Sequence, residues 1–205
     1  MIGAGGFGRE ALDVVEAANR VEPRWQVLGV IDDAPSSMAL ERLAARGVSH
    51  LGGVDVLEGY ERVEYLVAIG APRTRAAIDA RLLARGHTPA VVVHPTAVLG
   101  SQVVIGEGTV ICSGVQVSTN VRLGRHVHLN PNATIGHDAV LDDFVSINPA
   151  AVISGEVCVQ AQALIGAAAV VLQGLTVGAG AVVGAAACVT RDVAQAATVR
   201  GVPAR

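Results

Sequence analysis

Aromatic residues are scarce in this chain of 205 residues, because Phe, Trp and Tyr together make up only 2% of it. Charged residues contribute 16%, whereas apolar residues contribute 51%. A chain this apolar is expected to bury a substantial core rather than stay disordered. Without aromatic side chains, that core must consist of small aliphatic residues, which suits thin and regular layers of Ala, Val and Gly.

An excess of basic charge is also lacking, since the formal net charge is -3. A chain with this net charge has no excess of basic residues to bind nucleic-acid phosphates, so we expect no nucleic-acid partner. We find no run of 18 apolar residues and no charged segment that leads into an apolar stretch, which argues against membrane insertion and secretion. We therefore expect a cytoplasmic protein.

Cysteine is rare as well. Cys112, Cys158 and Cys188 form no CxxC pair and have no spacing typical of metal ligands. We expect three reduced thiols that pack as small side chains, and no metal site.

The second half of the chain repeats with a period of six. Steps of six from Val93 to Val189 meet an aliphatic residue at all seventeen positions, and the residue four places further on is Ala, Val, Thr or, once, Leu. Helices repeat at three and four residues and strands at two, so this period indicates a solenoid in which each six is one short strand and one corner. Three sixes then make one triangular coil of a parallel β-helix, and residues 18 apart stack.

The residues before the repeat alternate between strand-like and helix-like stretches. After the motif Gly3-x-Gly5-x-x-Gly8, a helix is expected, and further helices are expected at 39–47 and 73–86. Strands are expected at 25–33, 65–71 and 89–93. This alternation indicates a small parallel α/β sheet. We thus predict three regions: a nucleotide-binding α/β domain at 1–92, a β-helix at 93–197 and a tail at 198–205.

The glycine motif would present backbone N–H groups at a helix start, an arrangement that suits a phosphate group. Asp32 and Asp33 end the next expected strand, where such folds contact a ribose or base. About ninety residues supply too few strands for a full dinucleotide domain, so we expect a mononucleotide-sized ligand; a tight turn with no ligand is the alternative. The strand before the motif comprises only Met1 and Ile2, so we expect the native chain to start further upstream.

The two halves together resemble the hexapeptide-repeat sugar acyltransferase family, which includes the bacillosamine-pathway and perosamine N-acetyltransferases and the sialic acid O-acetyltransferases. The resemblance covers nearly the whole chain and rests on the segments GAGGFGRE, GVIDD, VAIG, VHPTAVLG, GHDAVLDDFVSINPAAVISG and RGVPAR. It implies a left-handed helix, and a homotrimer with active sites between protomers. The implied activity is acetyl-CoA-dependent N-acetylation of a UDP- or GDP-linked 4-amino-4,6-dideoxy sugar for surface glycan synthesis.

The resemblance also implies which residues bind the two substrates. The nucleotide sugar would contact the glycine motif, the acidic strand end and two further positions: Gly5, Gly6, Phe7, Gly8, Asp32, Asp33, Gly70 and Asn130. Acetyl-CoA would contact Ser146, Gly155, Gly201, Val202, Pro203 and Ala204. Family members often carry histidine where this chain has Phe7 and Ser146, and this difference leaves the exact sugar open. Asn148 follows Asn130 by 18 residues, so an asparagine ladder explains that pair equally well.

His137 is the candidate catalytic residue. It is the third residue of its six and therefore lies at a corner, and Asp138 follows it, where a carboxylate can orient the imidazole. Gly155 comes 18 residues later and leaves a backbone N–H on the same corner, placed for a developing oxyanion. The family has its catalytic histidine at this position. We predict direct transfer without an acyl-enzyme, in which His137 accepts the proton of the attacking amine.

Three alternatives remain open at this point. O-acetylation of a sugar such as sialic acid would use the same histidine. A zinc site formed by His126, His128 and His137 is disfavoured, because their places in the repeat do not put them at one level. A third alternative is a trimeric scaffold that binds a nucleotide sugar without catalysis.

Overall fold

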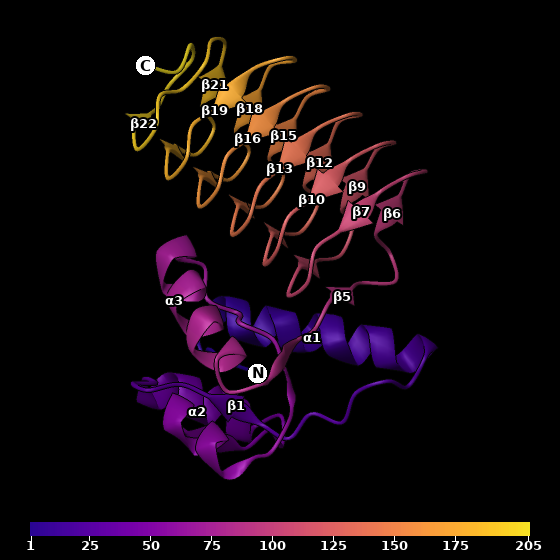
Figure 1. The fold of residues 1–205 in the computed structure, drawn as a ribbon, viewed down its shortest axis with the longest axis vertical. Helices are drawn as coiled ribbons and strands as arrows, with labels where there is room; N and C mark the ends of the chain where they lie inside the picture. Colours follow the sequence, from indigo (N-terminus) through magenta and orange to yellow (C-terminus); the bar gives the residue numbers. More distant parts are fainter. The chain divides into compact units, whose positions relative to one another are not determined.

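The computed structural model describes all residues from 1 to 205. The chain forms two compact units, Met1–Ala90 and Val91–Arg205, which we call the glycine-loop domain and the solenoid (Figure 1). None of the helices combines the length and the apolar character that crossing a bilayer requires.

A parallel sheet forms the centre of the glycine-loop domain. Its four strands are β1 (Val30–Ile31), β2 (His50–Gly52), β3 (Glu64–Tyr65) and β4 (Thr88–Pro89). β1 pairs with β2 and β3 pairs with β4, and Ile2 joins the two pairs through parallel bridges to Ile31 and Val67. The order across the sheet is therefore β2, β1, Ile2, β3, β4. The chain adds strands on one side of Ile2 and then on the other, which makes the crevice beside Ile2 a topological switch point.

Three α-helices and one 3₁₀ helix accompany this sheet: α1 (Gly6–Val21), α2 (Ser37–Ala44), α3 (Pro72–Leu83) and η1 (Val54–Gly59). α1 buries Leu12 and Val15, as expected from an apolar stripe at helical spacing. The Ser36 hydroxyl caps α2 by accepting the Ala39 N–H at 3.2 Å, and Pro72 occupies the first turn of α3, where its missing N–H costs nothing.

The structure corrects several of the predicted elements. The strand expected at 25–33 is reduced to β1, and the one expected at 89–93 is divided between β4 of the glycine-loop domain and β5 of the solenoid. β2 and η1 had not been expected. These segments are short and rich in glycine, so they carry too few residues to display a period.

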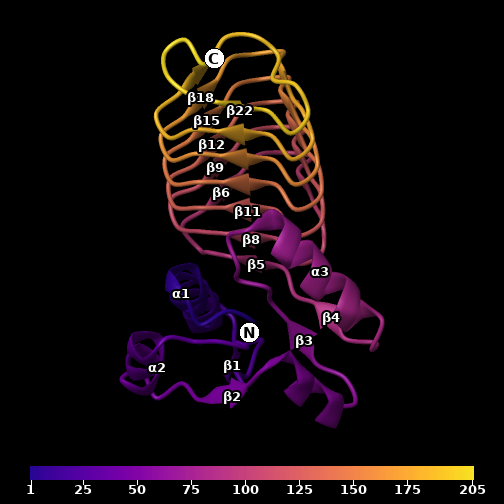
Figure 2. The ribbon, with the colours of Figure 1, turned by 90° about the vertical axis from the view of Figure 1, so that its left-hand side faces the viewer.

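The solenoid is a stack of two-residue strands separated by corners (Figure 2). The strands are β5 (Val92–Val93), β6 (Val98–Leu99), β7 (Val104–Ile105), β8 (Val110–Ile111), β9 (Gln116–Val117), β10 (Arg122–Leu123), β11 (His128–Leu129), β12 (Thr134–Ile135), β13 (Val140–Leu141), β14 (Ser146–Ile147), β15 (Val152–Ile153), β16 (Cys158–Val159), β17 (Leu164–Ile165), β18 (Val170–Val171), β19 (Thr176–Val177), β20 (Val182–Val183), β21 (Cys188–Val189) and β22 (Thr198–Val199).

These strands form three parallel sheets of five, seven and six strands, one on each face of the prism. Partners across a sheet are 18 residues apart, as in the pairing of Thr134 with Val152. The last coil is shorter, because Val182 pairs with Thr198. The coils therefore continue to Val199 within the segment 198–205 that was expected to be a tail, and only the residues from Arg200 onward lie beyond the last strand.

The aliphatic residues at the first place of each six point inward, as predicted. They are at most 3% exposed from Ile111 to Val189, whereas Leu99 in the first coil is 39% exposed. The small residues at the fifth place are also buried, as Ala133 and Ala151 illustrate. The fourth place makes the turn itself, because its φ is between +51° and +74° from Gln102 to Ala186. The six-residue period did not reveal this left-handed backbone, which recurs at each corner from Gln102 to Ala186.

Candidate active site

His137 and Asp138 lie together in the corner between β12 and β13. The His137 Nδ1 and Asp138 Oδ2 atoms are 2.7 Å apart. Both side chains reach solvent, with 57% of the His137 side chain and 46% of the Asp138 side chain exposed. The left-handed φ of +60° at Asp138 is the corner conformation shared by the other coils. The structure thus brings together the two residues that the sequence predicted as base and orienting carboxylate.

Asp138 fixes the role of each imidazole nitrogen. Hydrogen bonds from His137 and then from Asn120 hold the pKa of the Asp138 carboxyl below its usual range, so the carboxylate is ionised at neutral pH. An ionised carboxylate only accepts hydrogen bonds, which requires the proton of a neutral His137 to be on Nδ1. The lone pair is then on Nε2, the nitrogen that would act as base.

Gly155 lies against the imidazole one coil further along. A Cβ added to Gly155 would lie 2.6 Å from both the Cε1 and Nε2 atoms of His137, so only glycine accommodates the ring in this position. The Gly155 carbonyl accepts a hydrogen bond from Gly174, whereas its N–H donates none within the chain. An amide donor thus remains available on the coil next to the base, as the predicted oxyanion role requires.

Asn130 and Ser146 lie on another face of the prism. Asn130 follows β11 and Ser146 is part of β14, both in the seven-stranded sheet, whereas His137 follows β12 of the six-stranded sheet. The Asn130 amide donates to the Ile147 carbonyl at 2.8 Å and to the Asn148 side chain at 3.4 Å. The asparagine ladder, one of the two explanations considered for this pair, is therefore present. A single chain does not bring Asn130 or Ser146 to its own His137.

The C-terminal segment folds back on the last coil. Ala204 donates its N–H to the Cys188 carbonyl at 2.7 Å, and the Cys188 N–H donates to the Gly201 carbonyl at 2.9 Å. Ala204 is buried, whereas Val202 is 75% exposed. The segment from Gly201 to Ala204 thus has a fixed backbone, with Val202 and Pro203 on the surface.

The glycine motif forms a tight connection between the first strand residue and α1. A Cβ on Gly8 would lie 1.9 Å from the Gly3 carbonyl oxygen, so no larger residue fits there. By contrast, a Cβ on Gly5, Gly6 or Gly70 would meet nothing within 4 Å. α1 has no side-chain cap and no acidic residue in its first turn. An uncapped helix start beside open glycines at a switch point is suited to an anionic group.

Asp32 has a structural role that the sequence did not reveal. One carboxylate oxygen accepts the Ala4 N–H at 2.8 Å and the other accepts the Ala34 N–H at 3.0 Å. Asp33 in turn accepts the Val54 N–H at 2.8 Å, at the start of η1. Asp32 therefore ties the glycine motif to the end of β1. Its predicted contact with a nucleobase remains a prediction.

Two arginines beside the glycine motif were missed by the sequence reasoning. Arg9 donates to the Ala4 carbonyl at 3.0 Å, and Arg75 on α3 donates to the Ile69 carbonyl at 2.8 Å. Burial lowers the pKa of Arg75 to about 9. Arg9 directly follows the motif and could have been noticed, whereas Arg75 is one of three arginines in α3 and nothing in the sequence marks it out.

The three histidines considered as zinc ligands do not form a cluster. The His126 ring stacks on Phe144, with centroids 5.3 Å apart and an interplanar angle of 5°. No group of three or more His, Cys, Asp or Glu side chains has an arrangement that could hold a metal ion.

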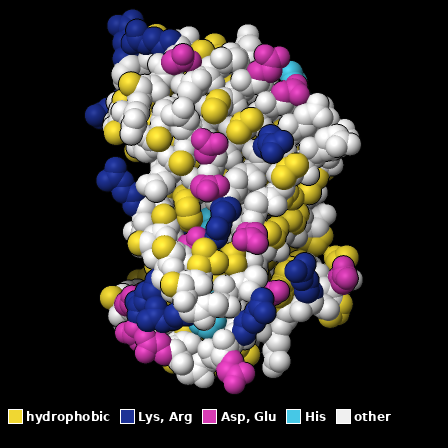
Figure 3. All heavy atoms as spheres, in the orientation of Figure 1, with side chains coloured by type: hydrophobic (Ala, Val, Ile, Leu, Met, Phe, Trp, Pro, Cys, Tyr) yellow, Lys and Arg dark blue, Asp and Glu magenta, His cyan; other side chains and the backbone are white.

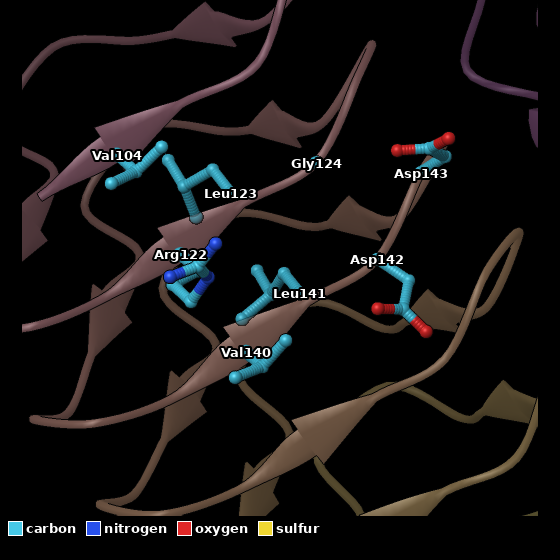
Figure 4. A pocket seen from close by; sticks show the side chains of 8 residues that line it. All are labelled: Val104, Arg122, Leu123, Gly124, Val140, Leu141, Asp142 and Asp143. Carbon is cyan, nitrogen blue, oxygen red and sulfur yellow. The ribbon is translucent and has the colours of Figure 1, made fainter.

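The five-stranded face of the solenoid carries a shallow pocket that contains none of the predicted site residues (Figure 4). Arg122 lies there between Val104 and Val140, with Asp142 and Asp143 at the carboxyl end of β13. On the side of the solenoid seen in Figure 3, basic and acidic side chains are scattered among hydrophobic and other atoms. The chemistry of the histidine corner is more specific than that of this pocket, and we place the candidate site at the corner.

Comparison with known proteins finds similar proteins for both halves of the chain. The PglD N-terminal domain family matches residues 1–82. WeeI from Acinetobacter baumannii AYE shares 29% identity and a TM-score of 0.88, over 100% of this chain and 96% of that one. The acetyltransferase domain of PglB from Neisseria gonorrhoeae FA1090 was solved with acetyl coenzyme A. It shares 29% identity and a TM-score of 0.85, over 100% of this chain and 96% of that one. PerB from Caulobacter crescentus, solved with CoA and GDP-perosamine, shares 28% identity and a TM-score of 0.82, over 100% of this chain and 94% of that one.

A sequence comparison with curated proteins gives no significant match. Over its whole length the chain is similar to sugar acetyltransferases, which supports the resemblance to the hexapeptide-repeat sugar acyltransferase family, and its solenoid is a left-handed parallel β-helix. The family resemblance and the fold class predicted from the sequence are thereby confirmed.

Proposed function

We propose that the protein is an acetyl-CoA-dependent N-acetyltransferase that acts on the amino group of a nucleotide-linked amino sugar. The observation that carries this proposal is the His137–Asp138 pair, which lies against Gly155 with the Gly155 N–H available. The similar proteins described above, with CoA, acetyl-CoA and GDP-perosamine in their structures, support the two substrate classes. No metal ion is needed for this chemistry.

The reaction would proceed by direct transfer. The sugar nitrogen forms a bond to the thioester carbonyl carbon, and the carbonyl oxygen gains negative charge that the Gly155 N–H can stabilise. His137 Nε2 takes the proton from the nitrogen, while Asp138 holds the imidazole through Nδ1. Collapse of the intermediate breaks the carbon–sulfur bond and releases the CoA thiolate, which takes up the proton.

The glycine-loop domain would bind the nucleotide part of the sugar substrate. The open glycines Gly5, Gly6 and Gly70 and the uncapped start of α1 support a phosphate site there. Phe7 and Asp33 belong to the same proposed site. The tail from Gly201 to Ala204 would contact CoA. The sugar is proposed to be a 4-amino-4,6-dideoxy sugar linked to UDP or GDP.

The active enzyme would be a cytoplasmic homotrimer with sites between protomers. More than half of the His137 side chain is exposed on an outer corner, so one chain does not enclose two ligands there. Asn130 and Ser146 lie on another face of the same chain and would complete the site of a neighbour. A monomer with full activity in sedimentation and activity measurements would contradict this arrangement.

CoA-thiol release from acetyl-CoA tests the activity. The acceptors would be UDP- and GDP-linked 4-amino-4,6-dideoxy sugars and free sialic acid. The proteins compared would be wild type, His137→Ala and, as a control at the same corner, Gln173→Ala. We expect release with one amino sugar, and a rate about 10²–10⁴-fold lower in His137→Ala. Release with sialic acid alone would instead establish O-acetylation. Equal rates in wild type and His137→Ala would remove His137 as the base. Nucleotide binding without any release of CoA thiol would favour a scaffold.

A further inference from the structure

The corner that carries Asp138 continues along the solenoid as a column of polar residues. Asn120, Asp138 and Glu156 occupy the fourth place of successive coils, with φ values of 59°, 60° and 60°. Their side chains therefore leave the backbone in the same direction, one coil above another. The preceding coil contributes the uncharged Thr119 and Asn120 to this corner, and the titratable neighbours of Asp138 along it are His137 and Glu156.

Asn120 is bonded directly to the carboxylate that holds the imidazole. Its Nδ2 donates to Asp138 Oδ1 at 3.0 Å, while His137 Nδ1 lies 2.7 Å from the other oxygen, Oδ2. The Asp138 N–H also donates to the Thr119 carbonyl at 3.0 Å. Both the backbone and the side chain of Asp138 are thus tied to the coil before it.

We propose that Asn120 is a positioning residue of the active site, which fixes the plane of the Asp138 carboxylate so that Oδ2 faces His137. The inference rests on the function proposed above. A carboxylate held through one oxygen alone can rotate, and the imidazole that it orients would move with it. A second hydrogen bond, from a rigid neighbouring coil, removes this freedom. The hydrogen bond from Asn120 also contributes to the lowered pKa of Asp138, after that from His137.

The left-handed corner by itself does not explain an asparagine at this place. Asparagine does tolerate positive φ better than most residues. However, Ala150, Ala168, Ala186 and Ala196 have the same conformation in this chain, with φ between 55° and 58°. The corner therefore forms without a polar side chain. What distinguishes Asn120 from these alanines is its contact with Asp138.

The test combines kinetics with a double-mutant cycle. Asn120→Ala should lower kcat on the order of 10-fold, with each KM changed by less than about 2-fold, because the base is misoriented while ligand contacts remain. In an Asp138→Ala background, the same change should alter kcat by less than about 2-fold, since the residue through which Asn120 acts is gone. Gln102→Ala is the matched control, because it truncates the same column one coil earlier and should leave kcat unchanged.

A second measurement does not depend on acetyl transfer. Carbon-13 NMR of the Asp138 carboxyl should give a pKa below the usual range in wild type and a higher one in Asn120→Ala. An equal loss of kcat in both backgrounds, or an unchanged Asp138 titration, would overturn the role of Asn120. If wild type transfers no acetyl group but its Asp138 titration responds to Asn120→Ala, the proposed function fails while the link between the two residues stands.

Discussion

Gly155 lies beside the His137 imidazole on the next coil, and a Cβ at Gly155 would lie 2.6 Å from the Cε1 and Nε2 atoms of the ring. The two residues are 18 positions apart in the sequence, which is one full coil. The proposed base and the proposed oxyanion donor are therefore placed by the stacking of two coils and not by a flexible loop. Their relative position should be as rigid as the β-helix itself.

Gly155→Ala is expected to abolish most activity without unfolding the solenoid. The added methyl group would displace the imidazole, and a shift on the order of 1 Å in a catalytic group costs about 10²-fold in kcat. The clash is with the movable end of a side chain, so the melting temperature should change little. Steady-state kinetics and thermal unfolding check both parts. Gln173→Ala, at the same corner one coil further on, is the control; activity equal to wild type in Gly155→Ala would contradict the geometry.

Two glycines of the same motif should respond differently to alanine. Gly8→Ala places a Cβ 1.9 Å from the Gly3 carbonyl oxygen and should destabilise the glycine-loop domain by about 1–3 kcal/mol, as overpacking generally does. Gly6→Ala meets nothing within 4 Å and should fold normally, but its methyl group would occupy the proposed phosphate site.

Calorimetric titration with UDP and GDP, together with denaturant unfolding, separates the two effects. We expect Gly6→Ala to keep its stability and to lose at least about 10-fold in affinity for the nucleotide, or about 1.4 kcal/mol. Unchanged affinity in Gly6→Ala would show that the nucleotide does not approach this helix start.

Asp138 should stabilise the fold in a pH-dependent way. Its folded-state pKa is depressed below 3.8, first by the hydrogen bond with His137, so the folded protein binds fewer protons than the unfolded chain as the pH falls. The stabilisation is fully present above the usual pKa and is lost as the pH falls through the lower folded value. Melting temperatures of wild type and Asp138→Asn should therefore differ at pH 7, and the difference should shrink as the pH falls below 3.8. A constant difference across this range would contradict the shift.

Asp142 should have the opposite effect. Burial, and then the charge of Asp143, raise its folded-state pKa above the usual 3.8. The ionised carboxylate is then disfavoured in the folded protein at neutral pH, and this penalty disappears as the pH falls through the raised value. Asp142→Asn should raise the melting temperature at pH 7 and give no gain at pH 3. A lower melting temperature at pH 7 would show that the carboxylate makes a favourable contact.

The solenoid and the geometry of its histidine corner could be predicted because their signal is periodic. The six-residue step from Val93 to Val189 gives the stacking of residues 18 apart, and this stacking alone places Gly155 beside His137. The left-handed corners were missed, because Gln, Asn, His, Asp and Ala all occupy them and no residue type marks the position.

The glycine-loop domain was less predictable because its contacts are not periodic. Asp32 was expected to face a ligand, and its bond to the Ala4 N–H depends on two strands being neighbours, which no spacing in the sequence reveals. Asn120 was missed for a related reason. The 18-residue rule placed it next to Asp138, but only the atomic positions show an amide pointing at a carboxylate oxygen.

The shortened last coil draws attention to the constant length of the other coils, which should not tolerate a change in the number of residues per turn. Paired strand residues in the last coil are 16 positions apart instead of 18, and this change of spacing lies after all the residues proposed for catalysis. An insertion of six residues before His137 would carry it to a different face of the prism, whereas an insertion of 18 would return it to the same corner, one strand spacing or about 4.8 Å higher. Natural variation in chain length within this domain should therefore come in whole turns, or be confined to the end beyond the site.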